Sequence, residues 1–203
     1  MSGEEEPGPP ASSATPDAVR AAKTAARRAA FARRAAAHAE APDDACAPLI
    51  EALAAHRGRP LSGYMPIRTE IDPRPAMALA ARHGSVGVPV IRAKGAPLDF
   101  HLWTPDTPMV PGPFGAMVPR EPRPMTPEVL IVPLAAFTRA GFRLGYGGGF
   151  YDRTLAALRA RGPVLAIGFA YAAQETETLP LEPFDAPLDL VVTETEVILP
   201  SPS

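Results

Sequence analysis

The sequence predicts an α/β fold: one domain with a largely parallel sheet and helices between its strands. Short runs rich in Val, Ile and Leu alternate along the chain with segments whose apolar residues recur at helical spacing. Several runs are apolar throughout rather than at every second position, which is typical of strands buried on both faces. With 203 residues, 46% of them hydrophobic, the chain can bury one real core.

At the N-terminal side, a tail and a helix are predicted. Residues 1–15 are acidic, small and proline-bearing, so we expect a disordered tail before a domain that covers 16–200. Residues 17–40 are mostly alanine and arginine and contain no proline or glycine, so they predict a long helix that ends before Pro42. Thr15 or Asp17 is suited to cap it, because a short oxygen-bearing side chain accepts from the free N–H groups of a first turn.

Strands and further helices follow in alternation, without an internal repeat or a long linker. Because parallel strands need crossover connections, usually helices, this order fits a single sheet. Strands are predicted over 61–65, 86–91, 98–103, 129–134, 164–171, 188–193 and 197–199, and helices over 48–56, 75–83 and 151–161.

Proline is unusually frequent, at 27 of 203 residues. It crowds the segment 105–133, where we expect an ordered surface excursion anchored by Phe114, Met117 and Met125. It is absent from 134–162. A segment without proline keeps all its backbone N–H donors, so this window is free to use them for binding.

Charge and cysteine content exclude several classes of protein. The 20 basic and 22 acidic residues give a net charge of −2, which argues against a protein that binds polyanions with its whole surface. The single cysteine, Cys46, forms no intrachain disulfide, and no apolar run approaches the ~20 residues that span a bilayer. The acidic start is unlike a secretory signal, so we expect a cytoplasmic protein with no membrane partner.

The most informative stretch is Arg143-Leu144-Gly145-Tyr146-Gly147-Gly148-Gly149-Phe150-Tyr151-Asp152-Arg153, which opens a predicted helix. Its glycines let backbone N–H groups turn toward an anion, and a helix N-terminus adds donors and a positive dipole end. A dinucleotide fingerprint would need glycine at Phe150, and a P-loop would need Gly-Lys-Ser/Thr. A phosphate cradle and a flexible turn both remain open. Asp152 fits the cradle with Mg²⁺ between acid and phosphate, and otherwise is an ordinary helix-start acid.

A second signal is the lysine at position 23. Of the 20 basic residues only Lys23 and Lys94 are lysines. Lys23 and Arg27 are four residues apart on the predicted helix and share a face, so they are suited to hold two parts of one polyphosphate. The alternatives are a solvated basic face and a nucleic-acid-binding helix over 20–34 that tracks phosphates.

Acidic positions near predicted strands are further candidates. Glu70 and Asp72 follow the strand predicted over 61–65, on the side where ligands of parallel sheets bind, although an acid before a helix is often a cap. Asp189 interrupts the apolar run 188–193, which fits a metal-facing carboxylate or a hydrogen-bonded structural one. The four histidines show no metal-ligand spacing, so zinc is not expected.

In this combination the chain resembles the 5-formyltetrahydrofolate cyclo-ligases, also called 5,10-methenyltetrahydrofolate synthetases, from about residue 19 to 199. The stretch 144–153 is close to the family's Leu-Gly-Tyr-Gly-Gly-Gly-Tyr-Tyr-Asp-Arg. The resemblance implies one α/β domain with a mixed, mainly parallel sheet sandwiched between helices. The other matches, in the family's order, are Lys23 with Arg27, Glu70-Ile71-Asp72, and Pro187-Leu188-Asp189 with Val192-Thr193.

The resemblance also implies a reaction. ATP and 5-formyltetrahydrofolate give 5,10-methenyltetrahydrofolate, ADP and phosphate, with Mg²⁺ as cofactor. The formyl oxygen attacks the γ-phosphate, and N10 then closes the ring as phosphate leaves. We therefore expect a ligase of folate metabolism that binds two small molecules and no nucleic acid, with a monomer favoured.

Site residues follow from the same resemblance, and none of them is a nucleophile. Phe150 replaces a tyrosine of the family, which removes one hydroxyl from the loop, and Arg68 and Arg74 are suited to meet the folate glutamate tail. The expected phosphate-positioning residues are Lys23, Arg27 and Arg143; the expected ATP contacts are these three and Leu144, Gly145, Tyr146, Gly147, Gly148, Gly149, Phe150 and Tyr151; the expected folate contacts are Met65, Glu70 and 146–150; and the expected magnesium ligands are Asp152 and Asp189.

Overall fold

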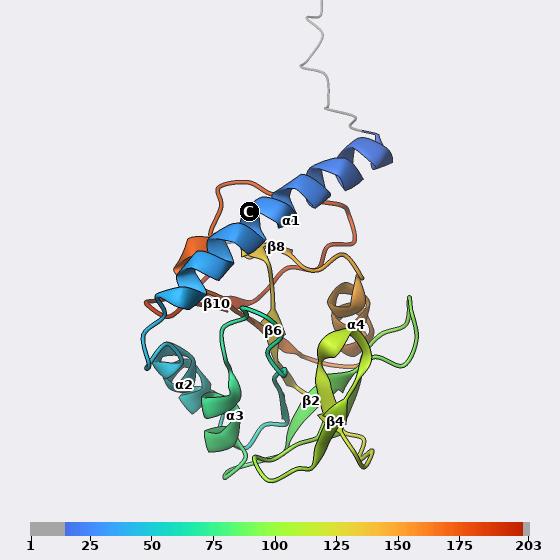
Figure 1. Cartoon of the computed structure of the whole chain (residues 1–203). Coiled ribbons are helices and arrows are strands. Elements are labelled where there is room, and N and C mark those ends of the chain that lie inside the picture. Colours follow the sequence, from blue (N-terminus) through green and yellow to red (C-terminus); the bar gives the residue numbers. More distant parts are fainter. Residues whose placement is uncertain (1–14, 201–203) are drawn as a thin grey trace, which may run out of the picture.

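The fold is α/β, as predicted, with a seven-stranded sheet at its centre (Figure 1). The computed structural model describes residues 15–200, so the expected N-terminal tail lies almost wholly outside the described residues. The five inner strands are parallel, and the two edge strands, β11 and β3, run antiparallel to their neighbours. The order across the sheet is β11 (Val197–Ile198), β10 (Leu190–Val192), β9 (Leu165–Phe169), β6 (Val129–Pro133), β1 (Leu61–Ser62), β2 (Val86–Val90) and β3 (Asp99–Leu102).

Helices cover both faces of the sheet. Helices α2 (Ala47–Leu53) and α3 (Arg74–Ala80) pack on one face, and α4 (Phe150–Arg159) packs on the other (Figure 1). Strand β6 serves both layers: Val129 and Ile131 face α2 and α3, while the intervening residues face α4. Burial on both faces explains why this strand is apolar at every position, as the sequence indicated.

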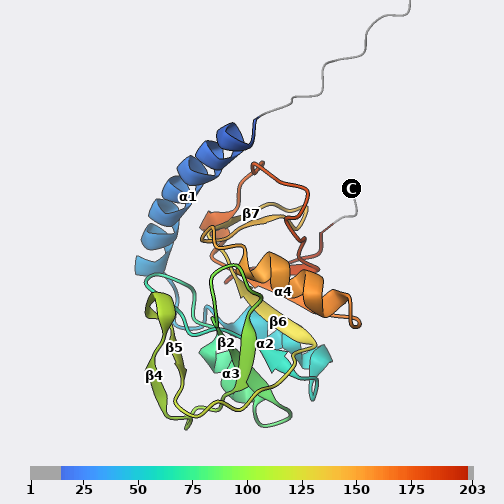
Figure 2. The ribbon, with the colours of Figure 1, turned by 90° about the vertical axis from the view of Figure 1, so that its right-hand side faces the viewer.

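Helix α1 (Pro16–Ala39) lies across one end of this sandwich (Figures 1 and 2). Thr15 caps it by accepting a hydrogen bond from the Ala18 N–H, one of the two caps proposed from sequence. Its middle packs through Ala30 against Ala135 and Ala136, which follow the carboxyl end of β6. The helix therefore covers the sheet edge at which ligands of parallel α/β proteins bind.

The proline-rich segment is ordered, as expected, but it contains a hairpin that the sequence pattern did not reveal. Strands β4 (Met109–Pro111) and β5 (Met117–Pro119) pair antiparallel outside the main sheet (Figure 2). Proline is tolerated there because each strand has a free edge. Of the expected anchors, only Met125 packs on the core; Phe114 and Met117 are exposed.

A second small ribbon also lay outside the predictions: β7 (Ala136–Phe137) pairs with β8 (Arg143–Leu144) just before the glycine-rich stretch. Short 3₁₀ turns complete the chain at Ala54–His56, Pro113–Gly115 and Ala172–Gln174. Among residues 15–200, no helix is both long and apolar enough to cross a membrane.

The β7–β8 turn makes a stability prediction. Gly141 has φ +84°, and a Cβ there would lie 2.8 Å from the Leu188 carbonyl oxygen. Gly95 has nearly the same φ, +81°, with nothing within 4 Å. Gly95→Ala should therefore cost only the backbone strain, about 1 kcal/mol, whereas Gly141→Ala should cost at least about 1 kcal/mol more because of the clash. Urea unfolding measures both, and equal losses would contradict the packing described here.

Candidate nucleotide and substrate site

Three cations of α1 form a stripe that faces the molecule rather than solvent. Lys23, Arg27 and Arg34, here called the α1 cation stripe, lie on one helical face together with the buried Ala30. Lys23 and Arg34 are buried and Arg27 is half-buried. A buried cation needs partners, and each of the three finds them on a different segment of the chain.

Lys23 is held by two carboxylates of the segment before β10. Its Nζ lies 2.6 Å from Glu182 Oε2 and 2.7 Å from Asp185 Oδ2. Burial alone would lower the pKa of Lys23, but hydrogen bonds and charge from Asp185 and Glu182 outweigh it and raise that pKa. The ammonium is therefore a fixed positive charge at the edge of the sheet.

Arg27 contacts the backbone of the glycine-rich stretch. Its Nε donates to the Gly145 carbonyl oxygen at 2.8 Å. Gly147 has φ +95°, and a Cβ there would lie 3.1 Å from the Arg27 guanidinium carbon. Burial lowers the pKa of Arg27 despite the nearby charges of Asp185 and Glu182. A side chain at this loop position would adopt a strained backbone conformation and would press against Arg27.

The loop that follows presents free backbone donors. Helix α4 begins at Phe150, with Gly149 before it in the left-handed region at φ +62°. Within residues 15–200, the N–H groups from Gly147 to Tyr151 make no hydrogen bond to another protein group. These donors point from a helix N-terminus, where the dipole favours an anion.

On the other side of this loop, the buried Arg143 pairs with the half-buried Asp152. Arg143 donates to Asp152 Oδ1 at 2.7 Å and also to the Ala186 carbonyl oxygen. The same Asp152 oxygen accepts from the Ala186 N–H at 3.2 Å. Burial lowers the pKa of Arg143, although the charges of Asp152 and Asp185 counteract it. Asp152 is thus bonded to Ala186, the residue that follows Asp185 in the chain.

The expected folate contacts gather around Glu70. This carboxylate is buried, accepts from the Ile67 N–H at 2.9 Å and lies 3.8 Å from an Arg34 nitrogen. Burial raises the pKa of Glu70, while Ile67, Tyr146 and Arg34 lower it. Met65 packs against the core beneath α2 and α3. Arg68 has φ +56°, and Arg74 instead pairs with Asp72 at 2.7 Å.

Two aromatic rings border the loop. Phe150, at the start of α4, lies 6.3 Å between ring centroids from Phe114, at the tip of the β4–β5 hairpin. Phe114 is 76% exposed and adopts φ +59°, a conformation that costs a bulky residue energy. The Tyr151 hydroxyl is buried and, among residues 15–200, makes no hydrogen bond. Both features lie beside the free donors and indicate a binding surface.

Asp189 does not lie with the other expected site residues around the glycine-rich loop. It pairs with Arg159 at 2.9 Å and accepts from the Ala166 N–H at 2.7 Å. Arg159 ends α4, whereas Asp152 lies in its first turn, so the two acids stand at opposite ends of a ten-residue helix. These contacts favour the structural alternative that the sequence left open for Asp189, whereas Asp185 lies beside Lys23 at the site.

The structure therefore brings together Lys23, Arg27, Arg143, the glycine-rich loop, Asp152 and Glu70 at the carboxyl edge of the sheet, whereas Met65 packs on the core. The sequence interpretation missed Arg34, Glu182, Asp185 and Phe114. Arg34 alone had a local signal, since it lies seven residues after Arg27 and continues the same helical face. The nucleic-acid-binding alternative gains no support, because Lys23, Arg27 and Arg34 are engaged by protein partners. The exposed arginines of 20–34 are Arg20, Arg28 and Arg33.

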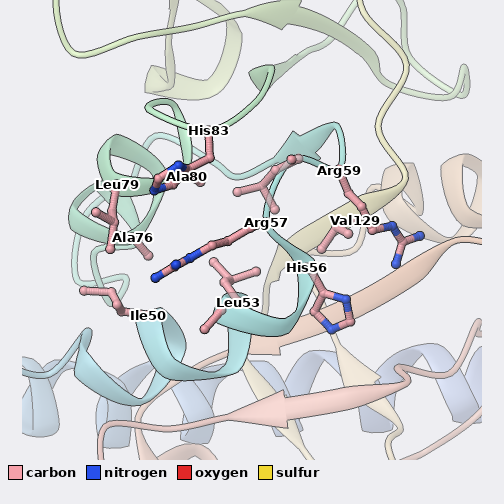
Figure 3. A pocket seen from close by; sticks show the side chains of 13 residues that line it. Ile50, Leu53, His56, Arg57, Arg59, Ala76, Leu79, Ala80, His83 and Val129 are labelled. Atoms are coloured by element: carbon pink, nitrogen blue, oxygen red, sulfur yellow. The ribbon is translucent and has the colours of Figure 1, made fainter.

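A separate small cavity lies at the other end of the strands (Figure 3). Leu61 and Val129, which begin β1 and β6, line it together with His56, Arg57 and His83. It is mostly apolar and shares no residue with the site described above. The chemistry-bearing residues and this cavity are therefore at opposite edges of the sheet.

Comparison with known proteins decides the family. A profile described as the 5-formyltetrahydrofolate cyclo-ligase family matches residues 13–194. The chain belongs to this family. A relative named 5-formyltetrahydrofolate cyclo-ligase from Mycolicibacterium smegmatis is 32% identical over 148 residues, 67% of this chain and 74% of that protein.

Other relatives agree. The 5-formyltetrahydrofolate cyclo-ligase of Haemophilus influenzae is 41% identical over 99 residues, which cover 46% of this chain and about half, 52%, of that protein. The solved structure of Aquifex aeolicus 5,10-methenyltetrahydrofolate synthetase superimposes with a TM-score of 0.72 at 26% identity, covering 89% of this chain and 94% of that one. The family membership thus extends through the fold as well as the motif.

The assignment of Asp189 makes a testable prediction. Asp189→Ala removes the acceptor of the Ala166 N–H and the partner of Arg159, so it should lower the free energy of unfolding by about 1 kcal/mol. Asp17→Ala, which removes an exposed acid 3.7 Å from Arg20, is the matched control and should change stability little. Thermal or urea unfolding distinguishes them. Unchanged stability of Asp189→Ala would argue against its structural role.

Proposed function

We propose that this protein is an ATP- and Mg²⁺-dependent ligase that converts 5-formyltetrahydrofolate to 5,10-methenyltetrahydrofolate, with release of ADP and phosphate. The observation that carries the proposal is the convergence of free N–H donors at the start of α4 with Lys23, Arg27 and Arg143. Family membership supplies the reaction, and this convergence supplies a place for its polyphosphate. A cytoplasmic location and a monomeric state remain predictions from the sequence.

The nucleotide end of the site is the loop 143–151 with the first half of the stripe. The free N–H groups can donate hydrogen bonds to phosphate oxygens. Lys23 adds a compact charge and Arg27 a planar one, which suits two neighbouring phosphates. Phosphoryl transfer needs mainly such positioning and neutralisation, so no protein nucleophile is required.

The acids beside this end fit Mg²⁺. Asp152 accepts from the Ala186 N–H, Asp185 is the residue before Ala186, and Glu182 shares the Lys23 ammonium with Asp185. Oxygen donors of this kind, few in number and next to a phosphate site, are what Mg²⁺ uses when a nucleotide supplies its other ligands. We therefore place the metal at Asp152 and Asp185 rather than at Asp189. When bound, Mg²⁺ would neutralise charge on the transferred phosphoryl group.

The folate end lies on the other side of the loop. Glu70 is a buried acceptor suited to the N–H donors of a pterin ring, and Tyr146 lies beside it. The rings of Phe150 and Phe114 offer apolar faces for a planar substrate at the loop's outer side. Because the loop borders both groups of residues, a bound formyl group would lie near the transferred phosphate.

The chemistry explains why the reaction needs ATP. An amide oxygen is a very poor leaving group, so N10 cannot displace it directly. Once the formyl oxygen has attacked the γ-phosphorus and ADP has left, that oxygen departs as phosphate when N10 bonds to the formyl carbon. The protein's contribution is to hold the two substrates in line and to exclude water from the phosphorylated intermediate.

The test is formation of the methenyl chromophore from 5-formyltetrahydrofolate. Absorbance should grow only when both ATP and Mg²⁺ are present, and chelation with EDTA should stop it. Asp185→Asn should raise the Mg²⁺ concentration needed for half-maximal rate by about tenfold or more, since it removes a charged oxygen ligand.

Asp189→Asn is the matched comparison, because it makes the same substitution four residues away. It should leave the Mg²⁺ requirement unchanged. A shift for Asp189→Asn and none for Asp185→Asn would move the metal to Asp189, and no chromophore from well-folded wild-type protein would end the proposal.

A further inference from the structure

The last member of the α1 cation stripe has no part in phosphate binding as described, yet it is the most completely buried of the three. Arg34 is only 2% exposed. Burying a guanidinium is costly unless its donors are used, so its partners should reveal what it is for. They lie on two segments distant from α1 in sequence, and both belong to the folate end of the site.

The first set of partners follows strand β1. Arg34 Nε donates to Thr69 Oγ1 at 3.1 Å, and a terminal nitrogen lies 3.8 Å from Glu70 Oε1. The second set is on the glycine-rich loop. The same terminal nitrogen donates to the Tyr146 hydroxyl at 2.7 Å, and the guanidinium lies over the Tyr146 ring, 5.5 Å from its centroid.

The stacking extends to α1 itself. The Arg34 guanidinium lies 5.1 Å from the centroid of Phe31, whose ring is 5.2 Å from that of Tyr146. The guanidinium thus contacts both rings of this aromatic pair, which restrains its orientation as well as its position. Because Arg34 donates to the Tyr146 oxygen, the phenolic hydrogen is left free to donate to Glu70, which is consistent with the mutual influence of these two groups.

We propose that Arg34 is a positioning residue that holds Glu70 as a carboxylate and fixes Tyr146, and that it thereby sets how tightly the pterin end of the folate binds. The binding half of this inference rests on the proposed function; the effect on Glu70 does not. The geometry also links the folate end to the nucleotide end, because Lys23, Arg27 and Arg34 lie on one helix.

The charges around Glu70 set the direction of the pH effect. Arg34 faces it from α1, Tyr146 from the loop, Tyr64 from the end of β1 and Tyr151 from α4. Arg34 is the only cation in this set. Burial raises the pKa of Glu70 and Arg34 opposes it, so loss of Arg34 should raise that pKa further. Glu70 accepts hydrogen bonds from the pterin N–H groups only as a carboxylate, so folate binding weakens as the pH falls through the Glu70 pKa. Without Arg34, this weakening should begin at a higher pH.

The first experiment needs no substrate. Carboxyl NMR titration of the free protein should show the Glu70 pKa raised by about one unit or more in Arg34→Met, and unchanged in Arg33→Met. Arg33 is the matched control, because it is the neighbouring, exposed arginine and donates only to the Ala173 carbonyl oxygen. An unchanged Glu70 pKa in folded Arg34→Met would overturn the inference.

The second experiment measures 5-formyltetrahydrofolate affinity by calorimetry from acid to neutral pH. Arg34→Met should weaken folate binding about tenfold at neutral pH, with little change in ATP affinity. The decrease of folate affinity at acid pH should also begin at a higher pH than in the wild type. In a Glu70→Gln background the decrease of folate affinity at acid pH should be absent. Adding Arg34→Met should then leave the pH dependence of folate affinity unchanged. A pH dependence of folate affinity that still shifts with Arg34→Met when Glu70 is absent would contradict the mechanism.

Arg34→Lys covers the case in which Arg34→Met does not fold. Lysine keeps the charge but loses the guanidinium's fixed donors and its contacts with the Phe31 and Tyr146 rings, so the Glu70 pKa should stay near the wild-type value while folate affinity falls. An Arg34→Lys protein indistinguishable from wild type in affinity would exclude a positioning role. Failure of wild-type protein to bind the folate would instead sink the proposed function and leave the titration result standing.

Discussion

Three cations buried on one face of α1 are the constraint on which the site depends. Lys23, Arg27 and Arg34 each need anionic or polar partners, and each finds them on a different segment: the acids before β10, the glycine-rich loop, and Glu70 after β1. Because the cost of burying an unpaired charge is several kcal/mol, these three segments are held against one helix. The helix therefore organises the whole carboxyl edge of the sheet.

A second constraint is that the glycine-rich loop must expose backbone N–H groups, rather than side chains, to a ligand. Gly147 and Gly149 adopt positive φ, which turns N–H groups outward at the start of α4, and Arg27 fills the space that a side chain at Gly147 would need. The same stretch carries Tyr146 toward Glu70. One loop thus borders both proposed substrates, which is what transfer of a phosphoryl group from one to the other demands.

The sequence predicted what local pattern determines and missed what distant contacts determine. Apolar runs and the long alanine-rich segment marked the strands and α1 correctly, because each is dictated by burial or helix propensity along a few residues. The β4–β5 hairpin was hidden by prolines at its free edges. Asp185 and Asp189 are four residues apart in an extended segment, roughly 13 Å when fully stretched, and only their partners, Lys23 for one and Arg159 for the other, show which one lies at the site.

The central claim is that the nucleotide binds at the carboxyl edge of the sheet, beneath the first half of α1. Amide hydrogen exchange with and without ATP and Mg²⁺ tests it most directly, since it locates the protected backbone without assuming a reaction. We predict protection in 143–153 and in the acid-bearing segment around 182–186, with no change around the cavity lined by Leu61, His83 and Val129. Protection at that cavity, with the glycine-rich loop unaffected, would contradict the account.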